Sequence, residues 1–370
     1  MKRISIVIGT RPEAIKMAPV VHALLSESSR SGFHVDVIAS GQHREIFDDV
    51  ADELKIPIAH NLRIGSPGKS LGAMTSSILT ELEKLFTEAR PDLVLVHGDT
   101  VTSFATALAC FYLGIKVFHV EAGLRSGDLS SPFPEELSRR AIALLASKHF
   151  AVDTEAADHL KSEGTDPKSI VIAGNTVLEH LKKWKQHTPR HPNLIITLHR
   201  REKGVGQIES ILNGVRSFHE RNPGVEIVFP LHPNPAIRTI ATRVLGDHRS
   251  VRLLPPLSHT DFLRRLARCT AVLTDSGGVQ EEATHFGKPV LVARDITERR
   301  AGVREGHVRI VGTSAQSVSR ALHRAFVKAH VLKQGKKGPA GAEKTSAIVS
   351  TSQIITDHVR RMLDDSDTST

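Results

Sequence analysis

Short apolar segments of β-type composition alternate with helix-forming segments along almost the whole chain. The expected strands are Ile4–Ile8, Val35–Ala39, Leu93–Val96, Val117–Val120, His149–Val152, Leu194–Thr197, Ile227–Pro230, Val251–Leu254, Ala271–Leu273, Pro289–Val292 and Val308–Val311. The expected helices lie around residues 12–29, 69–88, 102–112, 134–146, 204–220, 278–286 and 315–330. Such alternation is typical of a parallel sheet with helices on both faces. The sequence therefore predicts an α/β fold.

The chain has 370 residues, which is too long for one ordinary core and suits two domains. The polar, proline-bearing segment 174–193 is interpreted as the joint between them. We expect a first Rossmann-like domain over residues 1–173 and a second over 174–344. A helix near 345–363 is expected to cross back to the first domain, and 364–370 to be a frayed tail.

Composition limits the classes of partner. The net charge of +9 favours acidic ligands, but the chain has only one Tyr and one Trp, so stacking platforms for nucleic acid are scarce. We therefore expect a phosphorylated small molecule and no nucleic acid. No apolar stretch approaches the roughly 20 residues of a membrane span. Met1-Lys-Arg precedes a short β-type run instead of a signal-peptide apolar region, so we do not expect export. The isolated Cys110 and Cys269 fit buried thiols in a reducing cytoplasm.

Ionisable side chains follow several expected strands directly. The segments concerned are Gly9–Glu13, His97–Thr100, Glu121–Arg125, His199–Glu202 and His232–Asn234. In open α/β sheets, ligands bind beyond the carboxyl ends of the strands. Purely structural turns would not require ionisable residues at several independent strand ends, so this repetition predicts a ligand cleft between two domains.

A phosphate-binding helix end is expected after the strand Ala271–Leu273. There, Ser276-Gly277-Gly278 precede helix-forming residues, and a helix N-terminus with close backbone access binds anions. Glu281 and Glu282 fall one turn into the helix, where a carboxylate can accept hydrogen bonds from ribose hydroxyls. The structural alternative is a capped helix after a tight turn.

Several familiar cofactor signatures are missing from the sequence. No Gly-x-Gly-x-x-Gly follows a strand, and no paired Cys or His spacing suggests zinc, so neither NAD nor a metal is expected. Gly68-Lys69-Ser70 resembles the end of a phosphate-binding P-loop, but Arg63 replaces its first glycine. We therefore expect chemistry that needs no cofactor.

The motifs taken together resemble the bacterial non-hydrolysing UDP-N-acetylglucosamine 2-epimerases. The resemblance rests, in chain order, on Gly9–Pro19, Gly41–Glu45, His97–Thr100, His119–Arg125, Pro132–Glu136, Gly174–Thr176, His199–Glu202 and Leu273–Ala283. It implies two Rossmann-like domains in the GT-B arrangement, with the active site in the interdomain cleft. It also implies inversion at C2 between UDP-GlcNAc and UDP-ManNAc, by elimination of UDP to 2-acetamidoglucal and re-addition. A homodimer is implied by the resemblance as well.

The resemblance also implies roles for individual residues. Asp99, Glu121 and Glu135 match the acid/base carboxylates, and His199 faces the diphosphate or takes part in proton transfer. The positions matching substrate-binding residues are Arg11, Lys16, Arg139, His232, Ser276, Gly277, Gly278 and Glu282, with Glu282 on the ribose. The positions near a second, regulatory UDP-GlcNAc are Gln42, His43, Arg44 and Lys69.

Structural alternatives exist for four of these residues. Asp99 is also placed to cap the helix beginning near Val101, and Glu121 to form an ion pair with Arg125. Glu135 is placed to stabilise the dipole of the helix after Pro134, and His232 before Pro233 is typical of a turn.

Three other functions are compatible with the motifs. The segment Arg300–Glu305 faintly resembles an element of the hydrolysing epimerases, which release free ManNAc and UDP. A GT-B glycosyltransferase would need an acceptor site. A UDP-sugar sensor without catalysis is the third alternative, but it would not need all three acidic positions.

Overall fold

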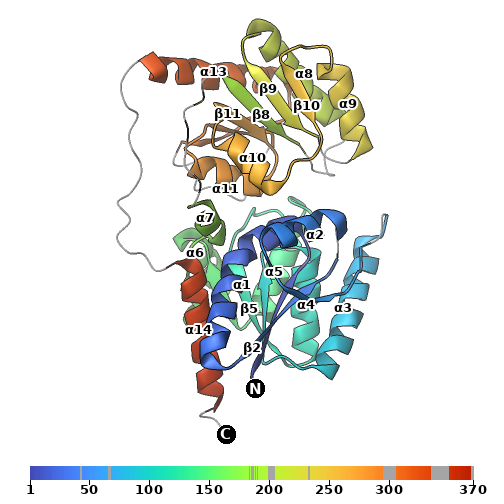
Figure 1. The fold of residues 1–370 in the computed structure, drawn as a ribbon, viewed down its shortest axis with the longest axis vertical. Helices are drawn as coiled ribbons and strands as arrows, with labels where there is room; N and C mark the ends of the chain where they lie inside the picture. Colours follow the sequence, from blue (N-terminus) through green and yellow to red (C-terminus); the bar gives the residue numbers. More distant parts are fainter. Residues whose placement is uncertain are drawn as a thin grey trace. The chain divides into compact units, whose positions relative to one another are not determined.

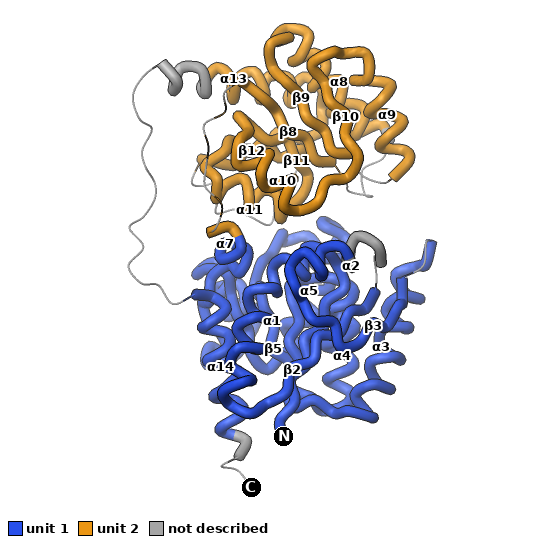
Figure 2. The backbone as a smooth tube through the Cα atoms, viewed as in Figure 1, with its two compact units in different colours: residues 1–180, 347–370 blue, residues 181–346 orange. Residues whose placement is uncertain are grey.

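The computed structural model describes residues 1–41, 44–65, 68–182, 184, 187, 189, 191–198, 205–231, 234–294, 306–334 and 350–367. The chain divides into two compact units, shown in Figure 2. Unit 1 comprises Met1–His180 and Ala347–Thr370, and unit 2 comprises Leu181–Ser346. Each unit is a parallel α/β sheet with helices, which confirms the predicted fold class of two Rossmann-like units.

Unit 1 alternates strands and helices along the chain (Figure 1). Its strands are β1 (Arg3–Ile8), β2 (His34–Ala39), β3 (Ile58–Asn61), β4 (Leu93–His97), β5 (Lys116–Ala122), β6 (Lys148–Ala151) and β7 (Ile170–Ile172). Its helices are α1 (Arg11–Ser31), α2 (Arg44–Glu53), α3 (Leu71–Glu88), α4 (Val101–Tyr112), α5 (Glu135–Leu145), α6 (Thr154–Ser162), a 3₁₀ turn (Pro167–Ser169), α7 (Thr176–Leu181) and α14 (Thr351–Asp367). The strands pair in the order β3-β2-β1-β4-β5-β6-β7, and every pairing is parallel.

The middle strands of unit 1 are buried because helices cover both faces of the sheet. Helices α3, α4 and α5 pack beside one another over one face, where Val94 and Val96 of β4 join their apolar core. Leu93 and Leu95 alternate with these residues along the strand and are also fully buried. A strand that is apolar on both faces is typical of a parallel sheet, which explains why β4 could be predicted from its composition.

Helix α14 returns from the far end of the sequence to unit 1, where it packs against α1 (Figure 1). Ile355, Val359 and Leu363 recur every four residues along it and are buried. The Thr351 hydroxyl donates to the Ala173 carbonyl at 2.8 Å, which fixes the start of the helix. The helix continues to Asp367, because no glycine or proline interrupts it, so residues 364–367 extend it instead of beginning the tail.

Unit 2 repeats the alternation with a smaller sheet. Its strands are β8 (Asn193–Thr197), β9 (Glu226–Pro230), β10 (Val251–Leu254), β11 (Ala271–Thr274), β12 (Val290–Val292) and β13 (Val308–Ile310). Its helices are α8 (Val205–Arg221), α9 (Pro235–Leu245), α10 (His259–Leu266), α11 (Gly277–His285) and α13 (Ala315–Gln334). The strand order is β10-β9-β8-β11-β12-β13, again entirely parallel.

The expected strands are all present in the structure, while the short elements β3, β7, α2, α6, α7, α9 and α10 were not predicted. Cys110 and Cys269 are buried free thiols as expected, and burial raises the pKa of Cys269 to about 12. Within the described ranges, no helix has the length and apolar character needed to cross a membrane.

Candidate functional site

The turn after β1 is organised by Glu13, a residue to which the sequence analysis gave no role. Its side chain is buried, and its Oε2 accepts hydrogen bonds from the backbone N–H of Gly9 at 3.0 Å and of Thr10 at 2.7 Å. Its Oε1 accepts from the hydroxyls of Thr100 at 2.7 Å and Ser103 at 2.9 Å, which lie after β4. Glu13 therefore ties together the carboxyl ends of two neighbouring strands. The Thr-x-x-Glu spacing of a helix capping box was the available signal.

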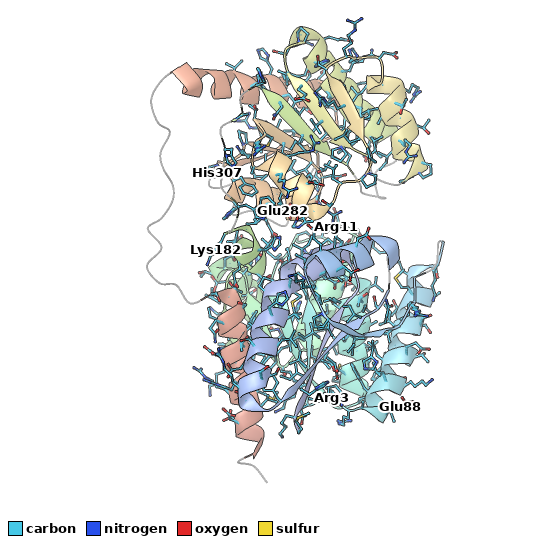
Figure 3. All side chains as sticks on the ribbon, viewed as in Figure 1. Arg3, Arg11, Glu88, Lys182, Glu282 and His307 are labelled. Atoms are coloured by element: carbon cyan, nitrogen blue, oxygen red, sulfur yellow. The ribbon has the colours of Figure 1, made fainter. Side chains whose placement is uncertain are left out.

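Gly9 is required at the end of β1 by close packing. A Cβ atom added there would lie 2.2 Å from the Thr102 hydroxyl and 2.4 Å from the Ser40 hydroxyl. Arg11, the first residue of α1 and labelled in Figure 3, follows directly. The tight turn thus places a predicted substrate-binding cation at the carboxyl edge of the sheet.

Glu121 lies in an unusual backbone conformation at the end of β5. Its φ is +60°, in the left-handed region that few non-glycine residues adopt, and the pairing with β6 shifts register between Val120 and Ala122. Such a bulge re-aims a side chain. The Glu121 carboxylate contacts the ammonium of Lys16, and its Oε2 lies 3.6 Å from Nε2 of His97. All three side chains are buried, so a cluster of ionisable groups lies under the carboxyl edge of the sheet.

The structural alternative for Glu121 was an ion pair with Arg125, and the structure, which describes both residues, does not contain this pair. Arg125 pairs instead with Glu163 of the α6 C-terminus through two parallel contacts, Nε to Oε1 at 2.9 Å and Nη2 to Oε2 at 2.6 Å. This bidentate arrangement lowers the pKa of the Glu163 carboxyl. Arg125 and Glu163 are therefore a structural pair, separate from the Lys16–Glu121 contact.

Asp99 follows the end of β4 and contacts Arg139 of α5. The N-cap of α4 is Thr100, whose hydroxyl accepts from the Ser103 N–H at 3.0 Å, so Asp99 is not the capping residue. Arg139 is itself buried and also donates to Oε2 of Glu136 at 2.9 Å. The predicted acid/base carboxylate and a predicted substrate-binding cation are therefore partners.

Glu135 and Glu136 begin α5 but have different surroundings. Glu136 is fully buried and accepts hydrogen bonds from the Ser126 N–H at 3.0 Å and from Arg140 at 3.1 Å, which assigns it to structure. Glu135 is only half-buried and is the first residue of the helix, where the dipole also favours a carboxylate. Its acid/base role stays a prediction.

His119 of β5 stabilises the turn that leads to Asp99. Gly98 has φ +66°, its N–H donates to the Val120 carbonyl at 2.9 Å, and its carbonyl lies 2.7 Å from Nε2 of His119. Burial lowers the pKa of His119 to about 3, so the ring is neutral and donates its Nε2–H to that carbonyl. His119 belongs to the predicted motif His119–Arg125, but this structural role was not predicted.

In unit 2, Ser276 caps the N-terminus of α11. Its hydroxyl accepts from the Val279 N–H at 3.5 Å, and its own N–H donates to the Thr274 hydroxyl at 2.9 Å. A Cβ atom added to Gly278 would meet nothing within 4 Å, so the space beside this turn is open in unit 2. Arg294 donates through Nε to the Asp275 carbonyl at 2.7 Å and holds the same turn. The helix end thus has the backbone geometry predicted for an anion site.

Glu282, labelled in Figure 3, lies on α11 about one turn beyond this end. Its Oε1 is 2.9 Å from Nε2 of His259, and both side chains are buried. Glu282 is a predicted site residue, whereas its partner His259 was not predicted, because it begins α10, a helix that the sequence pattern did not indicate.

Several predicted site residues cannot be placed. His199, His232, Gln42 and His43 lie outside the described residues, and only the backbone of Arg44, the first residue of α2, is described. Lys69 donates to the Ile64 carbonyl at 3.3 Å and to the Ser77 hydroxyl at 2.7 Å, just before α3. The regulatory role of these positions stays a prediction.

The sequence of this chain is similar to one family of known proteins. A family model described as UDP-N-acetylglucosamine 2-epimerase matches residues 26–352. The UDP-N-acetylglucosamine 2-epimerase of Bacillus subtilis is 41% identical over 329 residues, covering 86% of this chain and 86% of the relative. The enzyme of that name from Escherichia coli K12 is 40% identical over 330 residues, covering 84% and 87%.

Solved structures agree with these sequence relatives. The co-structure of S. aureus MnaA with UDP is similar with a TM-score of 0.88 and 37% identity, covering 98% of this chain and 97% of that one. UDP-GlcNAc 2-epimerase from Neisseria meningitidis bound to UDP-GlcNAc has a TM-score of 0.85 and 34% identity, covering 98% and 100%.

Proposed function

Because the chain belongs to the UDP-N-acetylglucosamine 2-epimerase family, we propose that it interconverts UDP-GlcNAc and UDP-ManNAc by reversible inversion at C2. The proposed route eliminates UDP to leave 2-acetamidoglucal and then adds UDP back, without releasing free ManNAc. The observation that carries the proposal is the ionisable cluster at the carboxyl edge of the unit 1 sheet. There, Glu121 contacts Lys16 and Asp99 contacts Arg139.

The elimination step needs a base and a stabilised leaving group in one transition state, because the C2 proton is only weakly acidic. A carboxylate takes the C2 proton, and the electron pair of that bond forms the C1=C2 double bond. The bond from C1 to the diphosphate oxygen breaks, and UDP leaves with its electron pair. We assign the acid/base work on the two faces of C2 to Asp99, Glu121 and Glu135.

The cations and the α11 helix end are assigned to the diphosphate. Arg11, Lys16 and Arg139 supply positive charge in unit 1, while the N–H groups around Ser276–Gly278 supply it in unit 2. Glu282 is assigned to the ribose hydroxyls. Relatives solved with UDP or with UDP-GlcNAc support this class of ligand. The predicted roles of His199 and His232 remain part of the proposal.

The proposal predicts isotope exchange at one carbon. In D2O, with UDP-GlcNAc and no added cofactor, deuterium should appear at C2 of both UDP-GlcNAc and UDP-ManNAc, because re-protonation draws on a carboxyl group that exchanges with solvent. Proton NMR of the sugar signals measures this directly. Epimerisation that retains protium at C2 would exclude the elimination route.

The same spectra separate the alternatives. Free ManNAc that accumulates in step with UDP would identify a hydrolysing enzyme. Binding of UDP-sugar with neither exchange nor turnover would identify a sensor, and turnover only after an acceptor is added would identify a glycosyltransferase.

A homodimer is part of the proposal, and an exposed apolar surface on unit 1 supports it. Phe111 and Tyr112 at the end of α4 are 60% and 61% exposed, and Leu137 and Leu144 on the adjacent α5 are 53% and 83% exposed. Large exposed apolar side chains on two adjacent helices are typical of an interface between subunits. A symmetric pair of copies covers the same surface on both partners and leaves no open site.

Leu144→Glu should therefore convert the dimer to a monomer, because the change buries two carboxylates in the paired surface. Light scattering should give the mass of one chain for the variant and of two chains for the wild type. Leu178→Glu replaces a 40% exposed leucine on α7, outside this surface, and should leave the mass unchanged. A wild-type chain that scatters as a monomer would contradict the proposal.

A further inference from the structure

The contact between His259 and Glu282 joins α10 and α11, the helices of unit 2 that follow β10 and β11 along the chain. His259 is the first residue of α10, where Ser258 caps the helix by accepting from the Asp261 N–H at 3.1 Å. Glu282 lies on α11, whose N-terminus is the proposed diphosphate site. The imidazole is therefore held by a capped helix end and directed at the carboxylate one turn from that site.

The direction of this hydrogen bond follows from the chemistry of the two groups. Nε2 of His259 lies 2.9 Å from Oε1 of Glu282, and the two side chains are 3% and 8% exposed. An ionised carboxylate only accepts, so the imidazole N–H donates. No described residue donates to Oε2 of Glu282. One oxygen is thus held in place while the other keeps its capacity to accept from a ligand.

A glutamate side chain has three rotatable bonds, and a carboxylate that binds a ligand must be held within a narrow range of orientations. A buried imidazole provides this constraint with a single donor. It leaves most of the acceptor capacity of the carboxylate for other donors, whereas an arginine fork would occupy both oxygens.

We propose that His259 is a positioning residue that orients the Glu282 carboxylate toward the ribose hydroxyls and so determines selectivity for a ribonucleotide over its 2′-deoxy analogue. This inference rests on the proposed function, which places the nucleotide at the α11 N-terminus. A site built to hydrogen-bond a hydroxyl rejects a ligand that lacks it, because the buried acceptor is then left unpaired. A carboxylate that can rotate accepts hydrogen bonds from other donors, so the site then rejects the 2′-deoxy analogue less strongly.

The test compares UDP with 2′-deoxy-UDP by calorimetry on the full chain. The wild type should bind UDP at least about ten-fold more tightly than 2′-deoxy-UDP. His259→Phe fills the same space without a donor and should reduce this ratio to near one, as should Glu282→Gln. His259→Gln keeps an N–H near the position of Nε2 and should retain most of the selectivity.

His285→Phe serves as the matched control, because His285 is an exposed histidine on α11, the helix that carries Glu282. It should leave the ratio unchanged. If His259→Phe does not fold, His259→Asn, whose shorter amide cannot reach Oε1, answers the same question in the same assay.

Failure of this inference can be distinguished from failure of the proposed function. If the wild type prefers UDP but His259→Phe and His259→Asn weaken both nucleotides equally, His259 is only structural and the inference is overturned. If the wild type binds neither nucleotide, the proposed function fails first, and the inference fails with it.

Discussion

Glu121→Gln should lower the turnover of UDP-GlcNAc by about 10²–10⁴-fold, the range expected when an acid/base group is lost. The amide has the shape of the carboxylate but cannot take the C2 proton. UDP affinity should change little, because Glu121 itself is assigned to no UDP contact and the proposed contacts of Ser276 and Glu282 are unchanged. Asp99→Asn and Glu135→Gln should lower turnover by a factor in the same range.

The Glu121→Gln change also leaves Lys16 buried beside a neutral group, which costs about 3–5 kcal/mol of stability. Turnover must therefore be measured well below the melting temperature and referred to folded protein. Glu163→Gln is the matched control, since it leaves the buried Arg125 beside a neutral group at a structural pair. It should lower the melting temperature while keeping turnover. If folded Glu121→Gln keeps near-normal turnover, Glu121 has no acid/base role and is only the structural partner of Lys16.

Ser276→Asp should abolish measurable UDP binding. Aspartate is a good helix N-cap, so α11 should remain capped and unit 2 should remain folded. The added negative charge would lie next to the diphosphate at a helix end suited to one anion. Two like charges about 4 Å apart near a protein surface repel by roughly 4 kcal/mol, which corresponds to about a thousand-fold loss of affinity.

Ser276→Asn separates charge from shape, because asparagine caps as well as aspartate and carries no charge. Calorimetry with UDP should show affinity within about ten-fold of the wild type for this variant. Undiminished UDP affinity in Ser276→Asp would show that the nucleotide binds elsewhere.

The order of strands and helices could largely be predicted because helices cover both faces of each sheet. A strand such as β4 is then apolar on both faces from Leu93 to Val96, and composition alone reveals it. The missed strand β3 reads Ile-Ala-His-Asn and lacks that signal, whereas β7 is the apolar run Ile-Val-Ile, which at three residues is too short to identify a strand. Helix α10 was missed because it has only eight residues, fewer than the roughly 11 over which helical periodicity is counted.

The location of the candidate site was predictable, whereas its internal contacts were not. Asp99 follows the end of β4 and Glu121 lies at the end of β5, and this position alone marks them. Their partners Arg139 and Lys16 lie 40 and 105 residues away along the chain, and spacing does not reveal such pairs. A signal for His259 did exist in Ser258 and Asp261, which have the spacing of a helix N-terminus after an expected strand.

The return of α14 to unit 1 determines the order in which the chain can fold during synthesis. Domains usually fold as units as they leave the ribosome, the first part first. Here the segment that covers the apolar face of α1 is translated only after unit 2. Unit 2 can therefore reach its native state while the earlier-made unit still exposes the surface meant for Ile355 and Val359. A stalled nascent chain would present that surface to chaperones.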